Sequence, residues 1–182
     1  PYAFIKHLYQ LRLNKRTGID IKGEARPLIK TPASPTWSAT TLPWMGFGYE
    51  VLVSPLQILT LYNAVANNGI MMKPYLVDSI EEYGKVIKDF SPVAEEKICN
   101  DTVLHQVQDI VRGVVEEGTA KEAFKGAPYT VAGKTGTALM ANGSHGYADK
   151  IYQSTFVGYF PADDPVYSCI VVVKNKPHAA KF

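Results

Sequence analysis

The sequence has few of the features that identify a metalloprotein, a membrane span or a nucleic-acid-binding protein. Its 182 residues include only two cysteines, Cys99 and Cys169, which lie far apart and form no metal-binding or redox spacing. No apolar run reaches the roughly 18 residues that a membrane span requires. The net charge is only +2, and no basic cluster stands out. We therefore expect no cysteine metal site and no nucleic-acid partner.

The composition instead suits a globular domain with a substantial core. Hydrophobic residues make up 46% of the chain, and the length fits one domain or a large part of one. The chain starts at Pro1 without an initiator methionine and stops at Phe182. We expect it to be an excised or processed segment, so a missing leader tells us nothing about where the parent protein is located.

Apolar periodicity and capping residues predict three helices. Residues 3–13 have apolar side chains at helical spacing. Residues 54–68 follow a capping Ser54 and a proline at the first helical position, and a third helix should run from Asp101 to Gly118. The buried faces of the second and third helices should contain Leu59, Tyr62, Val65 and Ala66, and Val103, Leu104, Val107, Ile110, Val111 and Val114.

Strand patterns and turn residues predict an antiparallel sheet. Residues 74–90 suit a hairpin that turns at Tyr83-Gly84. Three further strands are expected at 128–138, 151–160 and 166–174, joined by turns at Asn142-Gly143 and Asp163-Asp164-Pro165. Residues 16–27 should form a loop, and the irregular residues 28–48 should pack onto the body of the protein. The predicted fold class is therefore α+β, with an antiparallel β-sheet flanked by helices.

The run Lys134-Thr135-Gly136-Thr137-Ala138 is the strongest candidate site. Side chains alternate along a strand, so Lys134 and Gly136 should share one face and Thr135 and Thr137 the other. Lys134 would place a cation in a cleft, and Gly136 would let a ligand lie against the backbone. The backbone N–H of Thr137 could pair with an extended substrate. The small residues 131–133 and Ala138 predict a nearly bare groove around the lysine.

Two other interpretations of this run compete with a ligand-binding site. A lysine in a strand is often a solvated edge charge, but an edge charge does not need small neighbours on both sides. Gly133-Lys134-Thr135 also matches the end of a phosphate-binding loop. That motif requires glycine at position 128, where the sequence has Pro128, and a following helix, whereas Gly136 and two more glycines follow.

The Lys-Thr-Gly-Thr-Ala run, followed by the strand 156–161, resembles the transpeptidase domain of penicillin-binding proteins. Four further segments agree with this resemblance and occur in the same order, so that it spans about residues 4–176. The variant Gly48-Tyr49-Glu50 resembles the division-type, class B members. The four segments are Arg16–Asp20 with Gly23-Glu24, Gly48–Glu50 with Ser54–Gln57, Ala66–Gly69, and Val114–Ala120.

The resemblance implies a five-stranded antiparallel sheet between helical layers and a serine D,D-transpeptidase that cross-links peptidoglycan stem peptides. Such an enzyme would need no metal and no organic cofactor. Lys134, Thr135 and Gly136 would form the catalytic motif, with Lys134 holding the substrate carboxylate. Thr137 and Ala138 would bind substrate, and the N–H of Thr137 would be one oxyanion-hole donor. The partners would be stem peptides, β-lactam antibiotics and, for the parent, division proteins.

Two motifs of this family are absent from the chain. None of its eight serines has lysine three places on, and none has asparagine two places on. We expect residues 1–182 to be the C-terminal part of the domain and inactive alone, with the parent anchored in the bacterial inner membrane and this part periplasmic. The alternatives are a β-lactam sensor domain and a non-catalytic binding module of the same fold.

Overall fold

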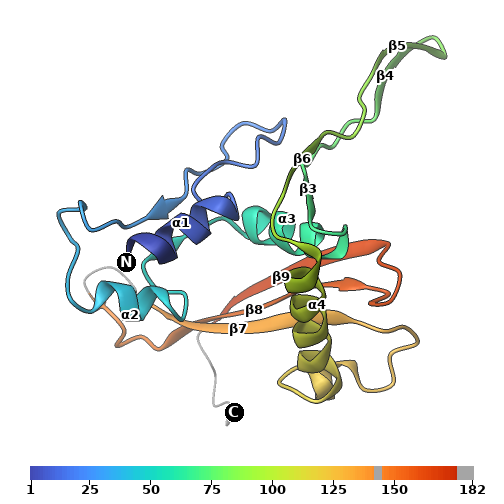
Figure 1. Cartoon of the computed structure of the whole chain (residues 1–182). Coiled ribbons are helices and arrows are strands. Elements are labelled where there is room, and N and C mark those ends of the chain that lie inside the picture. The colour runs from blue at the N-terminus through green and yellow to red at the C-terminus, as the bar shows by residue number, and fades with distance from the viewer. Residues whose placement is uncertain (142–144, 176–182) are drawn as a thin grey trace.

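A three-stranded antiparallel sheet with two helices on one face forms the body of the protein. The computed structural model describes residues 1–141 and 145–175 (Figure 1). The strands are β7 (Ala132–Met140), β8 (Ile151–Phe160) and β9 (Tyr167–Asn175), in the order β7-β8-β9. The helices α3 (Pro55–Ala66) and α4 (Asp101–Glu116) share one core cluster with this sheet. The predicted α+β class is confirmed, although the described residues supply three strands of this sheet and not five.

Shorter elements surround this body. The helix α1 (Tyr2–Gln10) opens the chain, and the short elements α2 (Thr41–Met45) and η1 (Lys121–Phe124) lie in connecting segments. Among the described residues there are also three two-stranded sheets, and each is antiparallel. They pair β1 (Leu28–Ile29) with β2 (Val51–Leu52), β3 (Ile70–Met72) with β6 (Ala94–Lys97), and β4 (Ser79–Glu82) with β5 (Lys85–Asp89).

The predicted elements are recovered with shifted boundaries. The hairpin turns at Tyr83-Gly84, where both residues have positive φ (50° and 75°). The first strand of the main sheet begins at Ala132, four residues later than expected, and continues to Met140. The expected turn at Asn142-Gly143 lies outside the described residues. The sheets β1–β2 and β3–β6 were not predicted because runs of two to four residues show no periodicity.

The predicted buried face of α4 is partly wrong. Leu104 and Val111 are buried, but Val103 and Ile110 are 42% and 66% exposed. The helix contacts the sheet along a narrow stripe, and Val115 near its end belongs to that stripe. The core cluster joins this stripe to the sheet through Tyr159, whose burial raises the pKa of its hydroxyl to about 12.

The buried face of α3 is more polar than predicted. Val65 is buried as expected, but Leu59 is only half-buried, and Gln57, Thr60 and Ala64 are buried instead. Gln57 explains part of this difference. Its side chain accepts a hydrogen bond from the N–H of Ser54, and the Ser54 hydroxyl accepts one from the N–H of Gln57, which completes a capping box.

Gln57 also fastens α3 to the segment that follows α1. Its Nε2 donates to the carbonyl oxygens of Lys15, at 2.6 Å, and Leu13, at 3.4 Å. Buried polar groups require such partners. One side chain therefore caps the helix and links two segments that are more than 40 residues apart.

A carboxylate ties α4 to the end of the β7–β8 pair where β7 begins and β8 ends. Asp163, in the turn after β8, forms ion-paired and hydrogen-bonded contacts with Arg112 of α4 and accepts from the Thr130 hydroxyl at 3.0 Å. The hydrogen bonds from Thr130 and Arg112 hold the pKa of the Asp163 carboxyl below its ordinary value. This network fixes the backbone at Thr130, just before β7, and β7 carries the candidate site.

Substituting Gln57 with alanine should destabilise the protein by about 2–3 kcal/mol, since it removes half of the capping box and two buried hydrogen bonds. Ser54→Ala, which removes only a cap, should cost about 1 kcal/mol. Thermal and chemical unfolding of the two variants would measure the difference. Equal losses would show that the bonds to Leu13 and Lys15 contribute nothing.

The Asp163 network should make stability depend on pH. A carboxyl with a lowered pKa stabilises the folded state above its unfolded pKa, about 3.9, and loses this effect as the pH falls through the folded value. The difference in melting temperature between wild type and Asp163→Asn should therefore be constant near neutral pH and vanish in strong acid. Asp164→Asn, in the same turn, is the matched control. A difference that persists unchanged into strong acid would contradict this assignment.

Candidate active site

The residues of the candidate site lie on β7, at the edge of the main sheet. Lys134, Gly136 and Thr137 are exposed, and Thr135 and Ala138 are half-buried. The register places Lys134 opposite Val157 and Gly136 opposite Thr155 on β8 without interruption. Because directly opposed residues point to the same face, the predicted alternation of the lysine and the threonines is confirmed.

One contact identifies which backbone groups of β7 face away from β8. The N–H of Leu139 donates to the hydroxyl of Tyr49, at 3.3 Å, on the open side of the strand. In an antiparallel ladder, residues two apart direct their backbone groups the same way. The N–H and C=O groups of Thr137 and Thr135 therefore also point to the free edge, where another extended chain can pair with them.

The ammonium group of Lys134 lies over this free edge. Its Nζ donates to the carbonyl oxygen of Thr135 at 2.9 Å, and lies 3.5 Å from the Thr135 hydroxyl. That hydroxyl is 2.6 Å from the hydroxyl of Thr119, which follows α4. The structure thus brings a cation and two hydroxyls together beside backbone groups that point away from β8.

Thr119 was not singled out from the sequence. It lies in the segment Val114–Ala120, which indicated a helix end at Gly118 and formed part of the family resemblance, but neither signal gave Thr119 a role. Its contact with Thr135 spans 16 residues, and such a contact leaves no mark in local periodicity.

The prediction of a bare groove on both sides of Lys134 is wrong for one side. Val131, Ala132 and Gly133 are buried in the core. Gly133 packs directly against Gly158 on β8, and a Cβ at position 133 would collide with the Val157 carbonyl oxygen. Strand packing therefore requires Gly133, and Val131 and Ala132 belong to the core.

Gly136 has no such structural requirement. A Cβ built at this position would meet only the Cβ of Thr155, at the ordinary contact distance of 3.9 Å. The empty surface at Gly136 is therefore not explained by packing within the described chain. An approaching ligand would benefit from it, because it exposes the backbone beside Lys134.

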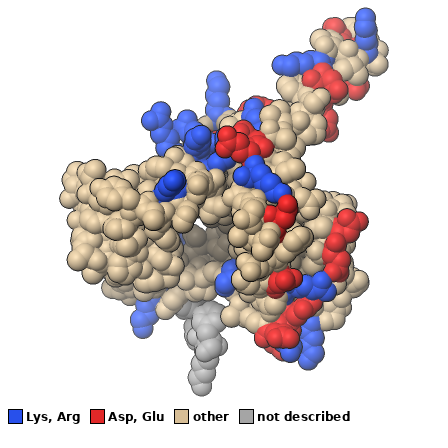
Figure 2. Space-filling view, viewed as in Figure 1, with Lys and Arg blue, Asp and Glu red and all other residues tan. Residues whose placement is uncertain are grey.

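A lobe formed by residues 28–52 adjoins the free edge of β7. The strands β1 and β2 close its base, and Tyr49 reaches from it to Leu139. The ring of Tyr49 contacts those of Trp44 and Phe47, with centroids 5.4 and 5.7 Å away. Figure 2 shows a hollow in the surface between this lobe, which displays few charges there, and the rest of the molecule. The contact with β7 comes from Tyr49, which follows residues 28–48, so the packing of residues 28–48 onto the body stays a prediction.

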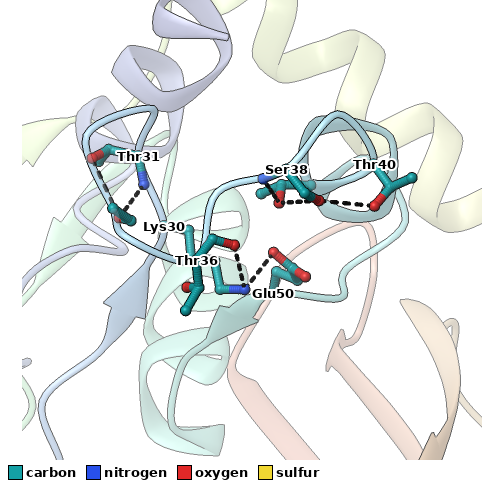
Figure 3. Close-up of polar contacts among 8 residues, drawn as sticks. Lys30, Thr31, Thr36, Ser38, Thr40 and Glu50 are labelled. Atoms are coloured by element: carbon teal, nitrogen blue, oxygen red, sulfur yellow. Dashed lines mark hydrogen bonds and ion pairs between the residues drawn. The ribbon is translucent and has the colours of Figure 1, made fainter.

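Polar contacts hold the lobe closed (Figure 3). Lys30 forms an ion pair with Glu50 at 2.9 Å, and its Nζ lies 3.5 Å from the carbonyl oxygen of Thr36. The hydrogen bond from Lys30 holds the pKa of the Glu50 carboxyl below its ordinary value. Thr31 and Ser38 begin tight turns closed by hydroxyl groups. The ion pair at the base therefore fixes the residue next to Tyr49.

Comparison with known protein families shows which family has this sequence. The family described as "Penicillin binding protein transpeptidase domain" matches residues 3–182. This chain belongs to that family. The structural neighbours share the β-lactamase-like fold, and the relatives are of the class B group that the Gly48-Tyr49-Glu50 segment indicated.

Individual relatives match nearly the whole chain. Stage V sporulation protein D of Bacillus subtilis is 31% identical over 97% of this chain and 27% of its own length. Peptidoglycan D,D-transpeptidase FtsI of Escherichia coli is 29% identical over 99% of this chain and 28% of its own length. The chain therefore spans about a quarter of the length of these relatives.

A solved structure agrees with the fold. Penicillin-binding protein 3 of Mycobacterium tuberculosis, complexed with aztreonam, matches 97% of this chain and 40% of its own chain, with 27% identity and a TM-score of 0.77. Within residues 1–141 and 145–175, no cluster of three His, Cys, Asp or Glu side chains suits a metal ion. None of the helices in those ranges is long and apolar enough to span a membrane.

The two glycines of the site should respond differently to alanine. Gly133→Ala should destabilise the protein by about 3 kcal/mol, because its Cβ would collide with the backbone of β8. Gly136→Ala should change the free energy of unfolding by less than about 1 kcal/mol. Denaturant titrations of both variants would test this, and a large loss for Gly136→Ala would mean that packing, and not ligand access, requires the glycine.

Proposed function

We propose that this chain provides the substrate-carboxylate and backbone-pairing part of a peptidoglycan D,D-transpeptidase active site. The observation that supports this most directly is the free edge of β7. The backbone groups of Thr135 and Thr137 point outward there, beside the ammonium group of Lys134. A site of this kind suits a short extended peptide that ends in a carboxylate.

Lys134 and the neighbouring hydroxyls would bind that carboxylate. A charge-assisted hydrogen bond from an ammonium group is about twice as strong as a neutral one. Thr135 already lies within reach of Nζ, and Thr119 supports its hydroxyl at 2.6 Å. A terminal carboxylate would replace the Thr135 carbonyl oxygen as the partner of Nζ.

The backbone of β7 would orient the scissile bond. An extended stem peptide pairs with the outward groups of Thr135 and Thr137, and the bare surface at Gly136 lets it lie close. The N–H of Thr137 would then donate to the oxyanion that develops on the attacked carbonyl. Ala138, next along the strand, keeps the row free of bulky side chains.

The attacking serine would come from outside these 182 residues, since no serine in the chain has lysine three places on. Its oxygen would bond to the carbonyl carbon of the penultimate residue of the stem peptide. The bond to the terminal amino acid would break, and that residue would leave as the protonated amine. The amine of a second stem peptide would then displace the serine and form the cross-link.

The relatives support the setting of this reaction. One carries the name peptidoglycan D,D-transpeptidase and another was solved with aztreonam, so β-lactams are expected to acylate the same serine. We place the site outside the cytoplasmic membrane, on a membrane-anchored parent that works with division proteins.

The intact mass of the protein after incubation with a penicillin tests the proposal. We expect an adduct on the parent domain that extends upstream of Pro1 and none on the 182-residue chain. Lys134→Ala in the extended protein should slow adduct formation about 10- to 100-fold, because a charged hydrogen bond is lost.

Lys125→Ala is the matched control, because Lys125 is also exposed and precedes the same strand. It should form the adduct at the wild-type rate. An adduct on the 182-residue chain would place the nucleophile among its own serines. An extended protein that never forms an adduct would instead favour the non-catalytic binding module.

A further inference from the structure

The hairpin formed by β4 and β5 projects from the body of the protein (Figure 1). Among the described residues, these two strands pack closely only against each other. All residues from Ile80 to Asp89 are exposed. An isolated two-stranded hairpin is at best marginally stable in water, so a ribbon of this kind gains stability from any strand that joins it.

The apolar residues of the hairpin favour a partner at its edge and not on its face. Ile80, Val86 and Ile87 are each about half exposed, at 47%, 53% and 59%. The register places Ile80 opposite Lys88 and Val86 opposite Glu81, so the two apolar side chains lie on opposite faces. A partner that covers one face of the hairpin would leave the apolar side chain on the other face in water. A strand added at the edge places side chains beside the hairpin on both faces.

The sequence of β5 is complementary to itself in antiparallel pairing. Its five residues read Lys85-Val86-Ile87-Lys88-Asp89. Two copies paired around Ile87 place Lys85 of each copy opposite Asp89 of the other, and the two isoleucines opposite each other. Opposite charges then meet at both ends, and Val86 of each copy lies opposite Lys88 of the other on either side of the two isoleucines. Figure 2 shows acidic and basic side chains together on this arm.

The other edge of the hairpin does not have this property. The charged residues of β4 are Glu81 and Glu82, so two β4 strands offer each other no opposite charge. Pairing β4 of one copy with β5 of the next would leave an unpaired edge at each end and would not close. The β5–β5 contact closes around a two-fold axis, which is the commonest symmetry of protein dimers.

We propose that a second copy of this chain binds through the outer edge of β5, giving a four-stranded antiparallel sheet shared by two molecules. Ile87 has no partner on β4, because the register steps from Ile80–Lys88 to Glu81–Val86. Such a bulge increases the local twist. The shared segment is therefore short, and the contact belongs to the weak, transient class.

Charge reversal at the two ends of β5 tests this arrangement in the intact protein that carries the chain. Asp89→Lys and Lys85→Glu should each weaken self-association roughly tenfold, since two cross-strand pairs change from attraction to repulsion. An equimolar mixture of the two variants should recover association, because lysines then meet acidic residues at both ends. Sedimentation velocity across a concentration series measures this.

Asp89→Lys is the cleaner of the two variants. Within its own hairpin Asp89 lies opposite the uncharged Ser79, so the new lysine meets no like charge there. Lys85 lies opposite Glu82, and its reversal adds a repulsion inside the hairpin. A dimerisation constant that is the same for wild type and Asp89→Lys, or a mixture that associates no better than either variant, would overturn the proposal.

A disulfide test locates the axis. Ile87→Cys should form a covalent homodimer under mild oxidation, because the two side chains lie directly opposite each other. Tyr83→Cys is the control, since Tyr83 is fully exposed at the tip but distant from the axis. Equal cross-linking at both positions would contradict a two-fold contact through β5. The proposal would also be contradicted if the thiol introduced by Ile87→Cys formed its disulfide with a different protein and no covalent homodimer appeared.

Discussion

The candidate site depends on β7 being paired on one side only. β8 fixes every second backbone group of β7, and the remaining groups face outward. An edge strand of this kind normally invites unwanted pairing. Here the lobe of residues 28–52 limits the exposed stretch, since Tyr49 occupies the N–H of Leu139. The segment beside Lys134 stays open, so the contact with Tyr49 marks one limit of the site.

The position of this edge depends in turn on close packing between β7 and β8. Gly133 and Gly158 oppose each other, and a Cβ on Gly158 would collide with the Ala132 carbonyl oxygen. This close approach lets Tyr159 and Ala132 join the helical core on one face of the sheet. Three residues after Gly133, Gly136 is free of such constraints. The two glycines of β7 thus have different roles, one in packing and one in leaving the surface open.

Sequence patterns predicted the parts of the fold with strong local signals. Capping residues located α3 to within two residues, and alternation with turn residues located the hairpin and the three long strands. Local sequence signals failed to predict burial at positions where contacts between distant segments determine it. Gln57 is buried because its amide reaches Lys15, and Ile110 is exposed because the sheet covers only a stripe of α4. The Lys134 row was recognisable from its residues, but Thr119 and Tyr49 joined the site only through contacts across the fold.

The same physical feature, an unpaired strand edge, occurs twice in the chain with different surroundings. At β7 the edge carries a cation, two hydroxyls and a glycine, and aromatic rings flank one end, which suits a small anionic peptide. At β5 the edge carries lysine at one end, aspartate at the other and Ile87 midway between them, which suits an identical strand. The side chains beside an edge therefore determine what can pair with it. Substrate binding and self-association can consequently reside in separate parts of one chain without competing for the same surface.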